Sequence, residues 1–376
     1  LAGLFAPAST FKALSIFSAV NAGYNLNASY DCPGSYKVGN RDFTNYEAKT
    51  LGRMNMKEAI AVSCDTLWYK IAYAEWLKDG GLSPKNPNDY FFNTAHQFQL
   101  DKKTGIDLPG ELSGRIPDRQ WKIDYWKQNK NFYCNYQQRA AKKDLTPFLI
   151  QLAKENCIDG GVLRAGDAVN FSIGQGDTVI TPLKQAQIYS AIANGGTLWQ
   201  PLVAKAIVKT DGTVIKTFTP KVDGKVEADP KTFAWLRDAL HQVTISGTAA
   251  GAFAGFPIHV SGKTGTGEVF GLNSNGTKKN STSWFASFAP TENPQYAVVV
   301  MVSQGGTGAA AAGVGARQIY NTIYGVTGSK QIPENVVYPS GPPTKLPKIS
   351  PTTKVAVVKA SPSPSASASS KKKAVK

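Results

Sequence analysis

Helix-like hydrophobic patterning occurs in five segments of the chain. The first is apolar almost throughout and follows Pro7, which suits the start of a helix. The five segments are residues 10–22, 55–78, 181–194 and 230–245, and an alanine-rich run at 309–324. Together they predict a helical region that begins near the N-terminus and a closing helix near the end of the patterned sequence.

Strand-like runs concentrate in the C-terminal half. Asp211-Gly212 is a turn signal that predicts a hairpin over 204–219. Three further runs predict an antiparallel meander, at residues 258–264, 282–289 and 296–303. Residues 79–147 read as loop-rich, with scattered aromatic side chains that ordinary packing explains. The pattern predicts an α+β fold, in which a helical lobe packs beside an antiparallel sheet and a cleft separates them.

The length of 376 residues suits one large domain and a tail, which we divide into residues 1–328 and 329–376. An apolar content of 42% is ordinary for a protein with a sizeable core. No run reaches the roughly 18 apolar residues that a membrane helix needs. The longest strongly apolar stretch, at 297–302, has the length of a buried strand.

The formal net charge of +16 is unevenly distributed. Residues 340–376 carry eight lysines and no acid, and are rich in proline and serine, which predicts a disordered tail. The tail is either solubilising or a tether to anionic wall polymers or lipids, to which each near-surface lysine adds about 1 kcal/mol. Nucleic acid is disfavoured because the tail lacks interleaved aromatic residues.

Four cysteines are present, at positions 32, 64, 134 and 157. Sequence does not decide their connectivity, but Cys134 and Cys157 are the pair we expect, and Cys64 reads as a small buried residue. No C-x-x-C motif occurs and the three histidines are scattered. We therefore predict neither a metal site nor a cofactor.

Candidate chemistry begins at Ser9-Thr10-Phe11-Lys12. Residues i and i+3 share a helix face, so Lys12 is placed to reach the Ser9 hydroxyl. Serine becomes a useful nucleophile when a base lies within hydrogen-bond reach, and lysine serves if burial and its neighbours lower its pKa. Alone this pattern is weak, because a helix cap followed by a solvated lysine looks the same.

Two further motifs follow in order, Ser63-Cys64-Asp65 and Lys263-Thr264-Gly265. The triple S-x-x-K, S-x-N or a variant, and K-T-G is typical of serine penicillin-interacting enzymes. Flanking segments that carry the same resemblance are Gly174-Gln175-Gly176-Asp177, Thr181-Pro182-Leu183 and Trp284-Phe285-Ala286-Ser287-Phe288-Ala289-Pro290. Gln175 and Asp177 are expected to shape a turn near the site.

The chain resembles the transpeptidase domain of class B penicillin-binding proteins over roughly residues 6–325. Within that family it is most similar to the elongation-type, rod-shape enzymes, because Asp65 stands where division-type members usually carry asparagine. The resemblance implies the penicillin-binding-protein and serine β-lactamase-like fold. It also implies a peptidoglycan D,D-transpeptidase that cross-links D-Ala-D-Ala stem peptides during cell-wall elongation and binds β-lactams covalently.

Site roles follow from the same resemblance. Ser9 is the nucleophile and Lys12 its base; Ser63 passes a proton to the departing amine. Asp65 orients Lys12 and favours its protonated form at rest, and Lys263 supplies positive charge near Ser63 and the substrate carboxylate. Substrate binding is expected at three residues of the third motif: Thr264, Gly265 and Thr266.

The backbone N–H groups of Ser9 and Thr266 are expected to hold the oxyanion, where each donor is worth about 2.7–4 kcal/mol. Ala8 departs from the family, in which many members have glycine before the nucleophile. We expect alanine to be tolerated there if its φ is negative.

In the family, a membrane anchor, a pedestal and the first sheet strands precede the nucleophile. The resemblance therefore implies a fragment of the catalytic domain whose sheet lacks its N-terminal strands. It also implies a place at the extracytoplasmic face of the cell membrane and a membrane-embedded elongation glycosyltransferase as partner of the full-length protein.

Three alternatives remain open. A class D-like β-lactamase or β-lactam sensor shares two of the motifs, but we find no recognisable deacylating acid. A carboxypeptidase would use water as the acceptor. The third alternative is that the chain as given is a non-catalytic remnant that binds a partner.

Overall fold

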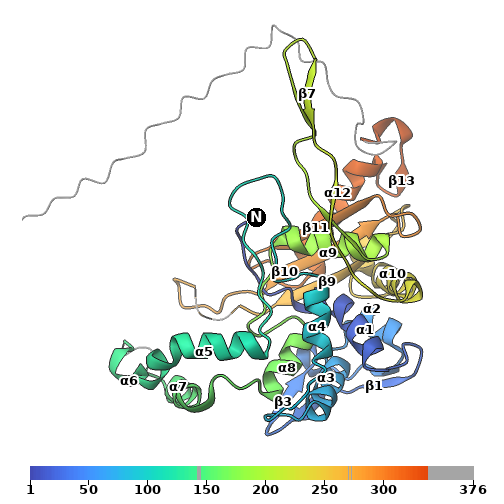
Figure 1. Ribbon diagram of the computed structural model, residues 1–376. Helices are drawn as coiled ribbons and strands as arrows, with labels where there is room; N and C mark the ends of the chain where they lie inside the picture. Colours follow the sequence, from blue (N-terminus) through green and yellow to red (C-terminus); the bar gives the residue numbers. More distant parts are fainter. Residues whose placement is uncertain (142–144, 270, 272, 338–376) are drawn as a thin grey trace, which may run out of the picture. The chain divides into compact units, whose positions relative to one another are not determined.

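The structure is a computed structural model that describes residues 1–141, 145–269, 271 and 273–337 (Figure 1). It confirms the predicted α+β class: helices pack around a small antiparallel sheet. Most of the predicted tail lies outside the described residues. In the part of the chain described, no helix is both long and apolar enough to cross a membrane.

A helix lies within each segment that was predicted to be helical, but several of these segments are divided into two elements. The first segment is a 3₁₀ turn that continues into an α-helix, and the closing helix begins with a π-helical turn. The helices of the first half are η1 (Ala8–Phe11), α1 (Lys12–Asn21), η2 (Tyr46–Ala48), α2 (Met56–Ala61), α3 (Thr66–Lys78), α4 (Tyr90–Gln97), α5 (Arg119–Cys134), α6 (Tyr136–Arg139), α7 (Pro147–Asp159) and α8 (Ala165–Ser172). Those of the second half are α9 (Pro182–Asn194), α10 (Pro230–Ile245), α11 (Ala250–Phe253), η4 (Ala309–Gly313), α12 (Val314–Tyr324) and η5 (Pro333–Asn335).

The segment 55–78, in which helix-like patterning was found, contains two helices, α2 and α3. Ser63 has a φ of +60°, a left-handed conformation that ends α2, and the chain restarts as α3 at Thr66. The Cys64 N–H donates to the Ala59 carbonyl at 2.9 Å, which closes the C-terminus of α2. The second motif is therefore the loop between two helices.

The prediction that residues 79–147 are loop-rich is wrong in part, because they include α4 and the sixteen-residue α5. The Asp118 side chain caps α5 by accepting from the Trp121 N–H at 2.7 Å. The His96 ring on α4 contacts Asp118 at 2.9 Å and Asp101 at 3.2 Å, and these carboxylates raise its pKa to about 9. This cluster joins the two helices.

The central sheet contains β9 (Ser261–Gly267), β10 (Thr282–Ala289) and β11 (Tyr296–Val302), in the order β11-β10-β9. Both pairs are antiparallel, as the predicted meander requires, with Trp284 opposite Gly265 and Met301. Every residue of β10 is buried, so both faces of this central strand are covered. Trp284 contacts Phe5 just ahead of η1.

The opposite face of β10 packs against the closing helices. Phe285 stacks on Phe253 of α11, and Ser287 shares a hydrogen bond with Tyr320 of α12 at 3.0 Å. Alternation along the strand therefore directs one face toward the first motif and the other toward the C-terminal helices.

Short strand pairs complete the fold. The hairpin of β6 (Ala206–Val208) and β7 (Val214–Thr217) confirms the turn predicted at Asp211-Gly212. The remaining pairs are β1 (Tyr30–Cys32) with β4 (Gly52–Met54), β2 (Ser35–Val38) with β3 (Arg41–Thr44), β5 (Thr197–Gln200) with β8 (Lys221–Lys225) and β12 (Val326–Thr327) with β13 (Lys330–Gln331).

All four cysteines form disulfides. Cys134 is joined to Cys157, which confirms the expected pair and links the end of α5 to α7. Cys64 is fully buried, as expected, but it also forms a disulfide with Cys32 at the end of β1, which the sequence did not indicate. The second motif is thus fixed to a strand 32 positions earlier in the sequence.

Candidate active site

Ser9 lies on η1, directly before α1, and is partly exposed while its neighbours Ala8 and Thr10 are buried. Its N–H belongs to the first turn of the helix, where backbone donors have no intrahelical partner. Ala8 has a φ of +50°, so the condition of a negative φ is not met. This conformation costs alanine about 1–2 kcal/mol, which the contacts around the turn must offset.

The loop at Gly174 supplies some of these contacts. The Ala8 N–H donates to the Gly174 carbonyl at 2.8 Å. A Cβ at Gly174 would lie 2.5 Å from both the Ala8 carbonyl oxygen and the Phe11 Cβ, and its φ is +70°. Only glycine fits, because a side chain would collide with the turn that carries Ser9.

Thr10 fixes the same turn through buried hydrogen bonds. Its hydroxyl donates to the Pro7 carbonyl at 2.6 Å and accepts from Gln185 Nε2 at 3.1 Å. The Tyr189 hydroxyl donates to the Thr10 carbonyl at 2.9 Å. Gln185 and Tyr189 lie on α9, whose start is capped by Thr181. The Thr-Pro-Leu segment of the sequence therefore serves to place α9 against the nucleophile turn.

Strand β9 packs against the other side of η1. A Cβ built at Gly265 would lie 3.1 Å from the Pro7 carbonyl oxygen, the Thr10 Cγ2 and the Trp284 Cβ. Gln175 Nε2 also donates to the Thr266 carbonyl at 3.3 Å, which joins the Gly174 loop to the strand. The third motif and the nucleophile turn are therefore in direct contact.

Lys12 is fully buried and joins the first motif to the second. Its Nζ donates to the Ser63 carbonyl at 2.8 Å, to Ser63 Oγ at 3.1 Å and to Asp65 Oδ1 at 2.5 Å. An ammonium group has three donors, and this arrangement uses all of them. The geometry therefore suits a protonated Lys12 in the absence of substrate.

Burial acts against that charge. Desolvation lowers the pKa of Lys12 below its usual 10.5, while the Asp65 carboxylate raises it and only partly compensates. Burial and the nearby Lys12 hold the pKa of Lys263 well below its usual value, again opposed by Asp65. One carboxylate thus faces two buried lysines, which disfavours a proton on both at once.

The third motif has internal partners that the sequence did not indicate. Lys263 Nζ donates to the Thr264 carbonyl at 3.1 Å, and the Thr264 hydroxyl shares a hydrogen bond with Thr248 at 2.6 Å. Thr266 Oγ1 accepts from the Gly308 N–H at 3.2 Å. Both hydroxyls expected to meet a substrate carboxylate are therefore already hydrogen-bonded, and Thr266 is the more exposed of the two.

The structure brings Lys12, Ser63 and Asp65 together, and Lys263 lies close enough for the charges of Lys12 and Asp65 to affect its pKa. It does not join Ser9 to Lys12: across the described residues, Ser9 Oγ has no hydrogen-bond partner, and the i,i+3 spacing did not produce that contact. Within the same residues no cluster of three or more His, Cys, Asp or Glu side chains suits a metal ion.

Sequence reasoning missed Asn45, Thr248 and Gly308, each of which supports a motif from a distant part of the chain. Single asparagine, threonine and glycine residues carry no periodic signal. Of the three, only Gly308 could have been noticed in the sequence. It lies close to Gly305-Gly306, and clustered glycines often mark places where two backbone segments approach closely.

Comparison with known proteins identifies the family of the chain. Residues 1–325 match the family described as penicillin binding protein transpeptidase domain. Peptidoglycan D,D-transpeptidase MrdA of Haemophilus influenzae is 26% identical over 84% of this chain and 44% of its own length. The Escherichia coli protein of the same name is 27% identical over 85% of this chain and 46% of its own. The chain therefore spans about half the length of these relatives.

Solved structures give the same picture. PBP2 of Pseudomonas aeruginosa is 26% identical, with a TM-score of 0.65 over 89% of this chain and 64% of that one. A Helicobacter pylori PBP2, solved with MreC, is 23% identical with a TM-score of 0.64 over 86% of this chain and 50% of that one, which shows the fold alone. The relatives' names confirm the predicted resemblance to the elongation type. The chain belongs to the penicillin-binding-protein transpeptidase domain family.

Proposed function

We propose that this chain is the catalytic part of a peptidoglycan D,D-transpeptidase that works through an acyl-enzyme on Ser9. The observation that carries the proposal is the junction at Lys12, where a fully buried amine contacts Ser63 and Asp65 one turn after Ser9. The family match and the names of the relatives support the reaction class.

In the first half-reaction, Ser9 Oγ attacks the carbonyl carbon between two D-alanines, and its proton passes to neutral Lys12. The C–N bond then breaks, the terminal D-alanine leaves with a proton delivered through Ser63, and the acyl group remains on Ser9. In the second, an amine of a neighbouring stem peptide attacks the ester carbonyl carbon, the ester C–O bond breaks, and the proton that the amine loses passes through Lys12 to Ser9 Oγ. Lys12 is neutral again after each half-reaction, and Ser9 regains its hydroxyl proton at the end of the second.

Lys12 must release a proton before it can act as the base, and its lowered pKa makes this easier. A substrate carboxylate bound beside Lys263 would favour protonation of that lysine. The resulting cation would lower the pKa of Lys12 further, because Lys12 already lowers the pKa of Lys263 and the repulsion between two like charges is mutual. Substrate binding would thus help to produce the neutral base. The Ser9 and Thr266 N–H groups remain the proposed oxyanion donors.

The partners and location belong to the same proposal. Stem peptides ending in D-Ala-D-Ala and β-lactams are the expected ligands, and the site lies on the extracytoplasmic side of the cell membrane. A membrane-embedded glycosyltransferase as partner of the full-length protein remains a prediction from the family resemblance.

The test uses a synthetic D-Ala-D-Ala donor peptide with and without an acceptor amine, and measures released D-alanine and the amide product by mass spectrometry. A transpeptidase forms the amide, and the product disappears in Ser9→Ala. D-alanine release with hydrolysis alone would indicate the carboxypeptidase alternative. Rapid hydrolysis of a β-lactam without peptide turnover would indicate a β-lactamase, although the matched family favours the transpeptidase.

A further inference from the structure

The start of helix α3 is capped in an unusual way. Asp65 is the N-cap residue, and an aspartate there normally accepts a hydrogen bond from its own helix. Here Asp65 has a helical backbone, with φ −94° and ψ −42°, and its side chain makes no capping bond. Its Oδ1 accepts from Lys12 Nζ at 2.5 Å instead. Another group must therefore satisfy the free N–H groups at this helix end.

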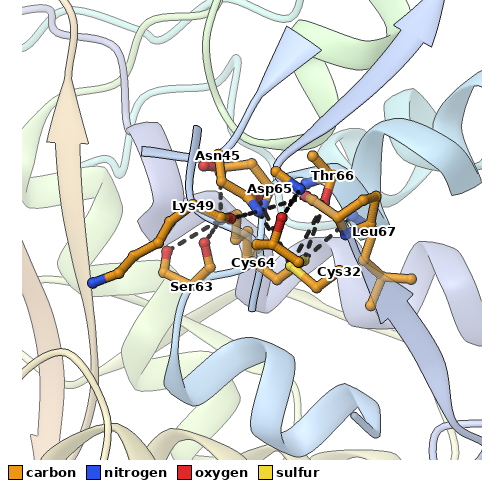
Figure 2. The surroundings of a disulfide bond; sticks show 12 residues. Cys32, Asn45, Lys49, Ser63, Cys64, Asp65, Thr66 and Leu67 are labelled. Atoms are coloured by element: carbon orange, nitrogen blue, oxygen red, sulfur yellow. Dashed lines mark hydrogen bonds and ion pairs between the residues drawn. A yellow bond between two sulfur atoms is a disulfide. The ribbon is translucent and has the colours of Figure 1, made fainter. Parts of the chain in front are cut away.

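Asn45, between β3 and η2, provides that group. Its Oδ1 accepts from the Asp65 N–H at 2.9 Å and from the Thr66 N–H at 3.0 Å. The next donor, the Leu67 N–H, contacts Cys64 Sγ at 3.4 Å. Figure 2 shows Asn45 lying over the segment from Ser63 to Leu67, with these contacts converging on the loop.

The Asn45 side chain is itself rigidly held. It is 4% exposed, and its Nδ2 donates to the Pro33 and Lys49 carbonyls, both at 2.8 Å. Pro33 directly follows Cys32, whose disulfide to Cys64 joins the same two segments covalently. The loop of the second motif is thus positioned by one amide and one disulfide from the β1–β4 region.

We infer that Asn45 is a positioning residue of the active site: by capping α3 in place of Asp65, it leaves the Asp65 carboxylate free to bind Lys12. This inference rests on the proposed function, since it assigns Asn45 a part in preparing the lysine base. Removing the amide leaves the N–H groups of Asp65 and Thr66 without their acceptor, and Asp65 carries a carboxylate at the same end of the helix. The helix dipole favours its turning toward them.

The consequence for Lys12 has a definite sign. Among the described residues, the titratable groups facing it are Asp65 and, from β9, Lys263; Tyr69 on α3 faces Asp65. Asp65 is the group that raises the pKa of Lys12, so its departure lowers that pKa. The acid limb of the acylation rate therefore moves to lower pH, while loss of orientation slows acylation on the order of 10–100-fold at the optimum.

Two variants and one control separate positioning from stability. Asn45→Ala removes the cap. Asn45→Asp retains an oxygen for the Asp65 and Thr66 N–H groups but loses the two Nδ2 donors, so it tests the acceptor role while also destabilising the loop. Asn55→Ala removes a comparable asparagine cap, that of α2, whose side chain accepts from the Glu58 N–H at 3.0 Å without touching Lys12 or Asp65.

The experiment measures the pH dependence of acylation by a fluorescent penicillin, the melting temperature of each variant, and the crystal structure of Asn45→Ala. We expect slow acylation and a downshifted acid limb in Asn45→Ala only, although all three variants lose stability. An unchanged limb in folded Asn45→Ala, or an equal shift in Asn55→Ala, would overturn the inference.

Failure of the wild-type chain to acylate would instead count against the proposed function. The crystal structure decides the inference in that case without any activity. Asp65 turned toward α3 and away from Lys12 supports it, and an unchanged Asp65–Lys12 contact contradicts it.

Discussion

The contact between β9 and the nucleophile turn makes a sharp prediction for Gly265→Ala. The added methyl group would lie 3.1 Å from the Pro7 carbonyl oxygen and the Thr10 Cγ2, and equally close to the Trp284 Cβ. These distances are a few tenths of an ångström too short, and Thr10 is already fixed by hydrogen bonds to α9. Either the strand or the turn must move.

Overpacking of this kind costs about 1–3 kcal/mol, and the lower entropy of the unfolded alanine variant returns about 0.4–1 kcal/mol. A net loss of about 1–2 kcal/mol corresponds to a fall of a few degrees in Tm. A misplacement of 1 Å can cost on the order of 100-fold in rate, so a shift of a few tenths predicts acylation roughly three- to tenfold slower.

Gly267→Ala is the matched control on the same face of the same strand. Its Cβ would meet the Ala6 carbonyl oxygen at 3.4 Å, an ordinary contact, so Tm and acylation should stay near wild type. The assay pairs thermal unfolding with the rate of labelling by a fluorescent penicillin. A Gly265→Ala variant with unchanged Tm but slow labelling would refute the steric argument, since it would locate the effect in substrate approach alone.

The two disulfides should differ in function but not greatly in stability. Loop-closure entropy predicts that replacing either pair of cysteines by serines costs about 3–4 kcal/mol of stability. Only loss of the Cys32–Cys64 disulfide should slow acylation by a fluorescent penicillin. Equal slowing after loss of Cys134–Cys157 would contradict this prediction. His96 should make stability depend on pH. Because its folded pKa is raised from 6.5 to about 9, its stabilisation is full below the lower value and lost as pH rises through the higher. Since the ring is 40% exposed, we expect the free energy of unfolding, measured with urea, to fall by about 1–2 kcal/mol over this pH range. The variant His96→Gln should lose this dependence on pH. If the dependence persists in that variant, another group causes it.

The pattern of apolar residues predicted those helices and strands in which apolar positions recur regularly or form a short continuous run. Strand β10 was found with its observed bounds of 282–289, because a short run of apolar and small residues between turn signals is typical of a buried strand. Helix α5 was missed because its residues are at most half-buried, and its half-buried face includes Arg119, Lys122 and Asn129, which interrupt any apolar stripe. The sequence did offer one signal for this helix: Asp118, a good N-cap residue, precedes a stretch without proline or glycine.

The candidate site was predicted as a set of residues but not as an arrangement. Motif order identified Lys12, Ser63 and Asp65, while Ser63's left-handed backbone and Asn45's cap depend on contacts between distant segments. Ala8 shows the same limit: its φ is positive and its N–H donates to the Gly174 carbonyl, and no local preference of alanine would indicate either.

Covalent labelling of the chain with a fluorescent penicillin, followed by mass spectrometry of the modified peptide, tests the central claim most directly. The account predicts a stable adduct on Ser9 that is absent in Ser9→Ala. An adduct on another residue, or none on the folded protein, would contradict the assignment of Ser9 as the nucleophile.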